Sequence, residues 1–388
     1  MVKLYLSYMT HLSLFVEQMK LIPDFRKRQG RRYELHHLLT IMVLAMLASA
    51  DDFEGIASFA KEKQGFLEEN GLIKNAKIPS HDLFRWVMMS IDKSMFSQFL
   101  VSWLESTDLV IPTDRYTHID GKVLRATRTG EHSRTGLLVL NAYCSHNNIT
   151  IGVSLEDKKS SEKTAIPKLI ESLHLEGSLT TIDAIGTMPH VAAAIRNKKA
   201  DYLLPLKKNN KLFYVEVADF FRVFSDTHLV KDRVETVENQ GGRVETRVCS
   251  IVTDLQLFPD AATWKDLKTL ISMERTRTIN GKTSTEKIFY LTNLSADSTA
   301  LMTAIRRHWQ IENNLHWHLD VAFNEDKLRL REKNATLCMA MLRRFCLTVL
   351  KRFDSKESIK ARRLQIAWNH DNLLNILKSL IINELHFC

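Results

Sequence analysis

Apolar residues recur at helical spacing through the first part of the chain, residues 1–108. The run Leu38–Ala50 is almost wholly apolar but too short to span a bilayer, which takes ~20 residues, so we expect a buried core helix. Asp51-Asp52 and Pro79-Ser80 each precede another apolar-periodic segment and predict helix N-termini there. With a basic cluster at residues 26–32, this region is predicted to be a small helical domain with candidate DNA contacts.

From Thr117 the pattern changes to short apolar runs separated by turn residues. The tripeptide His146-Asn147-Asn148 between two such runs predicts a β-hairpin. The predicted order begins with a strand (Thr117–Asp120), a hairpin of two strands (Gly136–Ser145 and Ile149–Leu155) and a helix (Thr164–His174). A strand (Ser178–Asp183), a second helix (Pro189–Lys198) and a last strand (Asp201–Leu206) follow. We therefore expect an α/β fold for this section.

Residues 230–295 alternate apolar and polar positions at period two, with turn signals at Gly241-Gly242 and Asn280-Gly281, and predict a β-rich insertion. Helical spacing returns at about Asp297. Because Arg306–Arg331 contains neither Gly nor Pro, we expect a long helix through most of it. One face of that helix would carry Ile305, Trp309, Glu312, His316, Leu319 and Phe323.

Composition narrows the class of protein. The 388 residues exceed what one hydrophobic core serves, and 45% apolar with 26% charged residues is typical of globular chains. A formal charge of +9 favours a polyanionic partner. The five cysteines are scattered and odd in number, which favours a reducing, cytoplasmic location. Since no segment suits a signal peptide or a membrane span, no membrane partner is expected.

Three carboxylates form the candidate chemical site. Glu312 lies within the apolar helix face, where an unpaired charge is costly and needs a partner: a cation such as Arg306 or Arg307, a metal ion or a hydrogen-bond donor. Asp120 and Asp183 each end an apolar strand, the place where side chains converge in α/β sheets. Three close carboxylates favour two Mg²⁺ or Mn²⁺ ions, the arrangement that supports phosphoryl displacement on nucleic acid.

Other interpretations compete with this one. His308, Glu312 and His316 follow one another at intervals of four residues and could suggest zinc, but HExxH is absent, and packed or hydrogen-bonded core histidines are favoured. Trp309 and Trp317 could stack on bases, although core packing is the commoner role of helical tryptophans. Three further acids lie nearby, Asp320, Glu325 and Asp326. We expect them to be solvated or to form salt bridges with Lys327 and Arg329.

Several motifs together carry a family resemblance that runs essentially end to end. They are IPDFR, DDFEGIASFA, IPSHDLFRWV, IDGKVLR, TAIPKLI, TTIDAIGT, DYLLPLKKN, GGRVETR and HWQIENNLHWHLDVAFNEDKLRLR. On these motifs the chain resembles bacterial insertion-sequence transposases of the H-repeat-associated type, which belong to the DDE superfamily. Gly241 stands where that family usually has His, and Asn209-Asn210 where it has Asn-Gln.

The resemblance implies a domain plan and a metal site. A helical transposase-associated domain would span 1–108, an RNase-H-like catalytic domain 109–352 with the insertion at 230–295, and a basic helical tail 353–388. Asp120, Asp183 and Glu312 would be the catalytic, metal-binding triad for two Mg²⁺ or Mn²⁺ ions.

The expected activity is binding of terminal inverted repeats followed by metal-dependent cleavage and transfer of DNA strands. The expected partners are double-stranded DNA and further copies of the chain, as a homodimer or larger assembly at the nucleoid. Candidate phosphate contacts are Lys122, Arg125, Lys207, Arg243, Arg247, Arg306 and Arg307. The alternatives are a catalytically decayed copy that represses transposition by binding DNA, and a metal-dependent nuclease without strand transfer.

Overall fold

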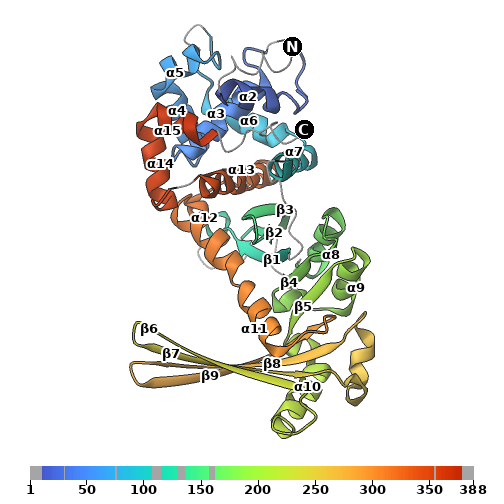
Figure 1. Ribbon diagram of the computed structural model, residues 1–388. Coiled ribbons are helices and arrows are strands. Elements are labelled where there is room, and N and C mark those ends of the chain that lie inside the picture. Colours follow the sequence, from blue (N-terminus) through green and yellow to red (C-terminus); the bar gives the residue numbers. More distant parts are fainter. Residues whose placement is uncertain are drawn as a thin grey trace, which may run out of the picture.

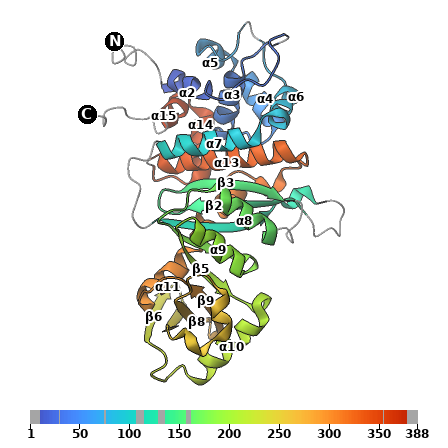
Figure 2. The ribbon, with the colours of Figure 1, turned by 90° about the vertical axis from the view of Figure 1, so that its right-hand side faces the viewer.

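A computed structural model describes residues 11–29, 31–74, 77–106, 115–128, 136–156, 162–353 and 355–377. Helices form one end of the molecule, and a long β-sheet runs from there to the other end (Figures 1 and 2). The N-terminal helices are α2 (His11–Met19), α3 (Leu35–Leu47), α4 (Phe53–Glu62), α5 (Gln64–Glu69), α6 (His81–Ser90) and α7 (Lys93–Ser106). The helical character predicted for this region is confirmed over its described residues.

The helix starts in this domain follow the capping chemistry of the sequence. The Asp52 carboxylate accepts a hydrogen bond from the Gly55 N–H at the start of α4, and the Ser80 hydroxyl accepts one from Leu83 N–H at the start of α6. Helix α3 is buried over almost its whole length, as predicted for the apolar run. Within the described residues, no helix is long and apolar enough to cross a membrane.

The predicted strands and helices of the central section are present. They are β1 (Tyr116–Val123), β2 (Leu138–Cys144), β3 (Ile149–Glu156), α8 (Glu162–Ser172), β4 (Leu179–Ile182), α9 (Pro189–Asn197) and β5 (Asp201–Leu206). The strands lie in the order β3-β2-β1-β4-β5, with an antiparallel hairpin followed by parallel pairs β1–β4 and β4–β5. This α/β arrangement is the RNase-H-like core that the resemblance implied.

The predicted β-rich insertion continues this sheet instead of forming a separate one. After α10 (Lys211–Val223), its strands are β6 (Asp232–Gln240), β7 (Arg243–Val252), β8 (Thr269–Ile279) and β9 (Lys282–Thr292). Strand β9 pairs antiparallel with β5, so nine strands form one sheet. Both predicted turns have left-handed residues, Gly241 and Gly242 in one and Asn280 and Gly281 in the other.

The single long helix predicted for Arg306–Arg331 is wrong. Helix α11 (Ser298–Arg307) ends in a turn, a π-helical segment follows at Glu312–His316, and α12 (Trp317–Val321) completes the run. A π turn holds more residues than an α turn, so the projected face is shifted. Trp309, assigned to the apolar face, lies in the turn before this segment and is 57% exposed.

Helix α13 (Lys333–Arg352) lies between the sheet and the N-terminal helices and is buried along most of its length (Figure 2). It contacts β3 on one side and α3, α6 and α7 on the other. The basic tail is helical where described, as α14 (Ile359–Trp368) and α15 (His370–Leu377), and packs against the N-terminal domain. Its Arg363 is buried and donates to the Met46 carbonyl and the Asp51 carboxylate, so this charge serves the fold.

Candidate active site

The register of two parallel strands brings Asp120 and Asp183 together. Ile119 on β1 pairs with Ile182 on β4, so the two aspartates occupy the next position on neighbouring strands. Asp183 directly follows β4, as predicted, and its carboxylate accepts a hydrogen bond from the Ala184 N–H. Asp120 was predicted to end its strand, but β1 continues to Val123 because β2 still pairs with it there.

Burial and charge act together on the Asp120 carboxyl. Its burial raises the pKa, and the nearby charges of Asp183 and Glu312 raise it further. The His316 ring and the Gly121 N–H, which donates to Asp120 Oδ1 at 2.8 Å, lower the pKa in part. A cation placed among these carboxylates would favour the charged form of Asp120 and so lower its pKa.

The π segment presents Glu312 to the same site. His316, one turn later, has its Nδ1 2.9 Å from Glu312 Oε2 and 3.5 Å from Asp120 Oδ2. The hydrogen bond with His316 is the main reason that the Glu312 pKa is lowered. One potential ligand atom from each of Asp120, Glu312 and His316 lies within 4.8 Å of the other two. Within the part of the chain that the structure describes, neither arginine considered for Glu312 pairs with it: Arg306 pairs with Glu238 at 2.7 Å, and the Arg307 guanidinium lies over the Tyr116 ring.

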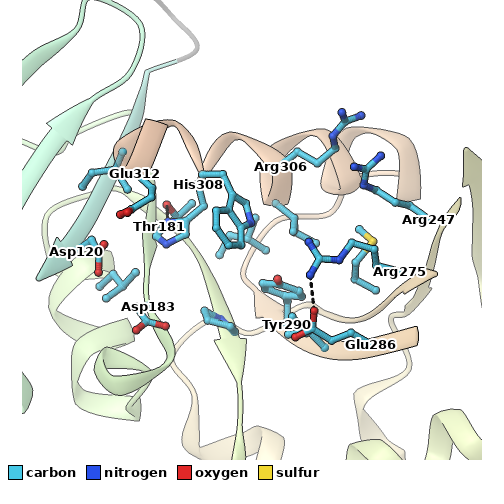
Figure 3. Close-up of a pocket in the computed structure, with 18 of the residues that line it drawn as sticks. Asp120, Thr181, Asp183, Arg247, Arg275, Glu286, Tyr290, Arg306, His308 and Glu312 are labelled. Atoms are coloured by element: carbon cyan, nitrogen blue, oxygen red, sulfur yellow. Dashed lines mark hydrogen bonds and ion pairs between the residues drawn. The ribbon is translucent and has the colours of Figure 1, made fainter. Parts of the chain in front are cut away.

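All three carboxylates line one cavity of about 920 Å³ (Figure 3). Asp120, Asp183 and Glu312 lie at one end of the view, and arginines from the insertion and from α11 lie at the other. Basic residues of the lining are Lys207, Arg243, Arg247, Arg275, Arg277 and Arg306. The cavity therefore combines an acidic centre with a cationic wall, an arrangement that suits a phosphodiester chain reaching the carboxylates.

A buried polar chain connects α11 to the core sheet beside the carboxylates. His308 Nδ1 lies 2.7 Å from Thr181 Oγ1, and the same hydroxyl lies 2.7 Å from His118 Nδ1. Burial lowers the pKa of His308 to about 4 and that of His118 to about 3, so both rings are neutral at pH 7. This chain holds the end of α11, and with it the start of the segment that carries Glu312.

Comparison with known proteins identifies the family. A family model of the transposase DDE domain matches residues 111–350, and a model of the DDE_Tnp_1-associated domain matches residues 16–104. The chain belongs to the DDE transposase family. "Putative transposase YncI" of Escherichia coli O157:H7 is 31% identical over 377 residues, which cover 96% of each chain. "H repeat-associated putative transposase YhhI" of Escherichia coli K12 is 28% identical over 374 residues, 94% of this chain and 98% of that protein.

The predicted phosphate contacts of the transposase fall into two groups. Four line the cavity, and these are Lys207, Arg243, Arg247 and Arg306. The other three do not line it. Lys122 is buried and its ammonium is 2.5 Å from Asp320 and 2.9 Å from Asp326, so two carboxylates already neutralise it. Arg125 pairs with Asp326, and the Arg307 guanidinium lies over the Tyr116 ring.

The acids that follow the triad have other partners than those predicted. Asp320 and Asp326 bind Lys122 instead of Lys327 and Arg329. Glu325 is buried and pairs with Arg344 at 2.7 Å. These pairings join residues 19 to 204 positions apart, so no local spacing could have revealed them.

Several lining residues were missed from the sequence. Arg275 and Arg277 alternate on β8 and point to one face, a spacing that could have suggested a basic strand face. Trp309 was assigned to the core but is exposed on the cavity wall. His316 was expected to be a packed or hydrogen-bonded core histidine; it is buried and hydrogen-bonded to Glu312, and it does not line the cavity.

Proposed function

We propose that this transposase binds the terminal inverted repeats of an insertion sequence and cleaves and transfers DNA strands with two Mg²⁺ or Mn²⁺ ions. The observation that carries the proposal is the meeting of Asp120, Asp183 and Glu312 in one cavity with an arginine-rich wall. Carboxylate oxygens are the donors that these hard cations prefer, so the residues present fit the ions.

Asp120, Asp183 and Glu312 would hold the ions. Bound there, divalent cations would activate water or a 3′-hydroxyl and stabilise the charge on the phosphoryl group under attack. The protein supplies the positions: the strand register fixes the two aspartates, and the His308–Thr181 hydrogen bond fixes the approach to Glu312. Lys207, Arg243, Arg247 and Arg306, with Arg275 and Arg277, would bind the phosphates that flank the scissile bond.

The matching experiment uses Asp183→Asn on an oligonucleotide that carries a terminal repeat. We expect end binding to persist and Mg²⁺-dependent nicking to disappear. Asp219→Asn is the matched control, because Asp219 is an exposed acid of α10 paired with Arg222, outside the cavity. Binding without nicking by the wild type in Mg²⁺ or Mn²⁺ would favour the repressor, and nicking without joined product would favour the nuclease.

The N-terminal domain offers a second DNA contact in this proposal. A groove of about 690 Å³ is lined by the exposed aromatic pair Phe25 and Trp86 and by basic residues that include Lys27 and Arg32. Neighbouring Arg26 is held by Asp24 and the Tyr33 carbonyl, which fixes the segment. Charge complementarity between this basic groove and the phosphate backbone favours duplex DNA as the occupant.

Salt dependence tests this second contact. Lys27→Ala/Arg32→Ala should make the negative slope of log K against log salt shallower by about 1.8, because each lost phosphate contact removes about 0.9 from its magnitude. Lys61→Ala, an exposed lysine of α4, is the control and should leave the slope unchanged. An unchanged slope in the double variant would exclude the groove as a DNA contact.

Joining two element ends also requires two active sites, so light scattering with repeat DNA should report at least a dimer.

A further inference from the structure

Behind the carboxylates, a chain of buried hydrogen bonds runs from α13 to the site. Arg344 Nε donates to Asn141 Oδ1 at 2.5 Å. Asn141 Nδ2 lies 3.2 Å from His316 Nε2, on the side of the ring away from the site. His316 Nδ1 faces the carboxylates of Glu312 and Asp120. Asn141 is paired directly with Asp120 across β1 and β2, so the strand register keeps these hydrogen bonds aligned with the site.

The donors and acceptors of this chain have only one consistent assignment. A guanidinium donates and never accepts, so Arg344 requires the oxygen of the Asn141 amide. The amide nitrogen must then face His316 Nε2, and the Val139 carbonyl, 3.3 Å from the same nitrogen, requires that orientation independently. Because an amide nitrogen only donates, His316 Nε2 must accept. The ring hydrogen therefore resides on Nδ1.

The Arg344 end of this hydrogen-bond network is fixed, so the Asn141 amide keeps its orientation. Arg344 Nη1 also donates to Glu325 Oε1 at 2.7 Å and to the Ala340 carbonyl at 2.9 Å. Arg344, Glu325, Asn141 and His316 are all buried, so water cannot replace a lost partner. Turning the Asn141 amide would oppose its hydrogens to the guanidinium and leave the Val139 carbonyl without its donor.

We infer that His316 is a positioning residue, held by Asn141 and Arg344 as an Nδ1–H donor that orients Glu312 toward Asp120, and that it is not a metal ligand. The nitrogen that faces the carboxylates carries hydrogen and has no lone pair for a cation. Glu312 needs such a donor because its side chain is 55% exposed and lies on a π turn. The link to metal binding rests on the proposed function, whereas the tautomer of His316 does not.

The tautomer is tested in the metal-free, full-length protein labelled with [¹⁵N]histidine. Among the fifteen histidines, the signal that disappears in His316→Asn belongs to His316. Long-range ¹H–¹⁵N correlations should show protonated Nδ1 and unprotonated Nε2. In Asn141→Asp the carboxylate can only accept, so Nε2 should become protonated, while buried His118 should keep its pattern. A wild-type signal with hydrogen on Nε2, or no response to Asn141→Asp, would overturn the inference.

Metal binding gives the second readout. Pulsed electron paramagnetic resonance of the Mn²⁺-loaded protein should detect no directly coordinated nitrogen. His316→Ala should weaken Mn²⁺ binding about 10- to 100-fold, the usual effect of losing a residue that orients a ligand. His316→Asn places an amide N–H near the former Nδ1 and should retain most of the affinity. A coordinated nitrogen, or equal losses in both variants, would make His316 a ligand. Absence of any Mn²⁺ binding would instead refute the proposed function, while the tautomer signal still decides the role of His316.

Discussion

The buried pair of Arg344 and Glu325 allows a stability prediction of definite size. Arg344→Met leaves the Glu325 carboxylate, which is 1% exposed, without the guanidinium 2.7 Å away. Removing one partner of a buried ion pair costs about 3–5 kcal/mol, because the remaining charge stays desolvated. We therefore expect the free energy of unfolding to fall by about that amount.

The double variant separates charge from packing. Arg344→Met/Glu325→Met removes both charges, and a buried pair replaced by apolar groups is often close to neutral. Asn141 still loses a donor, which costs about 1–3 kcal/mol, so the double variant should be more stable than Arg344→Met alone.

Urea unfolding followed by tryptophan fluorescence measures all three proteins, with Arg329→Met as the exposed control. A loss below about 1 kcal/mol for Arg344→Met, or a double variant less stable than that single variant, would refute the reasoning.

Three further predictions concern other parts of the fold. Burial lowers the pKa of Lys351 to about 8, whereas the unfolded lysine titrates near about 10.4. Between these pH values the unfolded chain binds more protons than the folded protein, so the free energy of unfolding should rise with pH by up to about 1.4 kcal/mol per pH unit. In Lys351→Met this rise in unfolding free energy with pH should disappear, as measured by urea unfolding at pH 8, 9 and 10. The same pH dependence in the variant and the wild type would contradict the prediction. A Cβ on Gly121 would lie 2.5 Å from the buried Glu162 carboxylate, so Gly121→Ala should displace β1 beside Asp120 and slow nicking about 10- to 100-fold. Gly65→Ala, with open space around the new Cβ, should nick normally. The buried Glu245 carboxylate binds three cavity arginines and so competes with DNA phosphates for them. Glu245→Gln should therefore tighten DNA binding in gel-shift titrations. Weaker binding would show instead that Glu245 holds these arginines in position for DNA.

Most of the fold could be predicted from local patterns. Apolar periodicity identified the N-terminal helices, and capping residues such as Asp52 marked where they begin. Turn chemistry identified the hairpins, including the left-handed Gly241-Gly242. The two aspartates could be found because each follows an apolar run, and parallel pairing of those runs then brings Asp120 beside Asp183.

What sequence patterns could not supply were the long-range partners and the irregular backbone. The turn at residues 308–309 and the π segment beginning at Glu312 have no composition signal, yet they interrupt the predicted helix, and Trp309 in that turn lies exposed on the cavity wall. The continuity of β5 with β9 depends on pairing across some ninety residues. Lys122 and Arg363 look like surface charges in the sequence, and only their distant carboxylate partners explain their burial.

Helix α13 limits how the chain can be divided or recombined. It follows Asp120, Asp183 and Glu312 in sequence, yet it fills the space between β3 and the N-terminal helices. A fragment ending near residue 104 would lack this helix and expose the apolar surfaces of α3, α6 and α7 that it covers. A chimaera that takes its N-terminal domain from a relative must therefore take a compatible α13 as well. Through this helix, changes in the packing of α3, α6 and α7 reach strand β3 of the sheet.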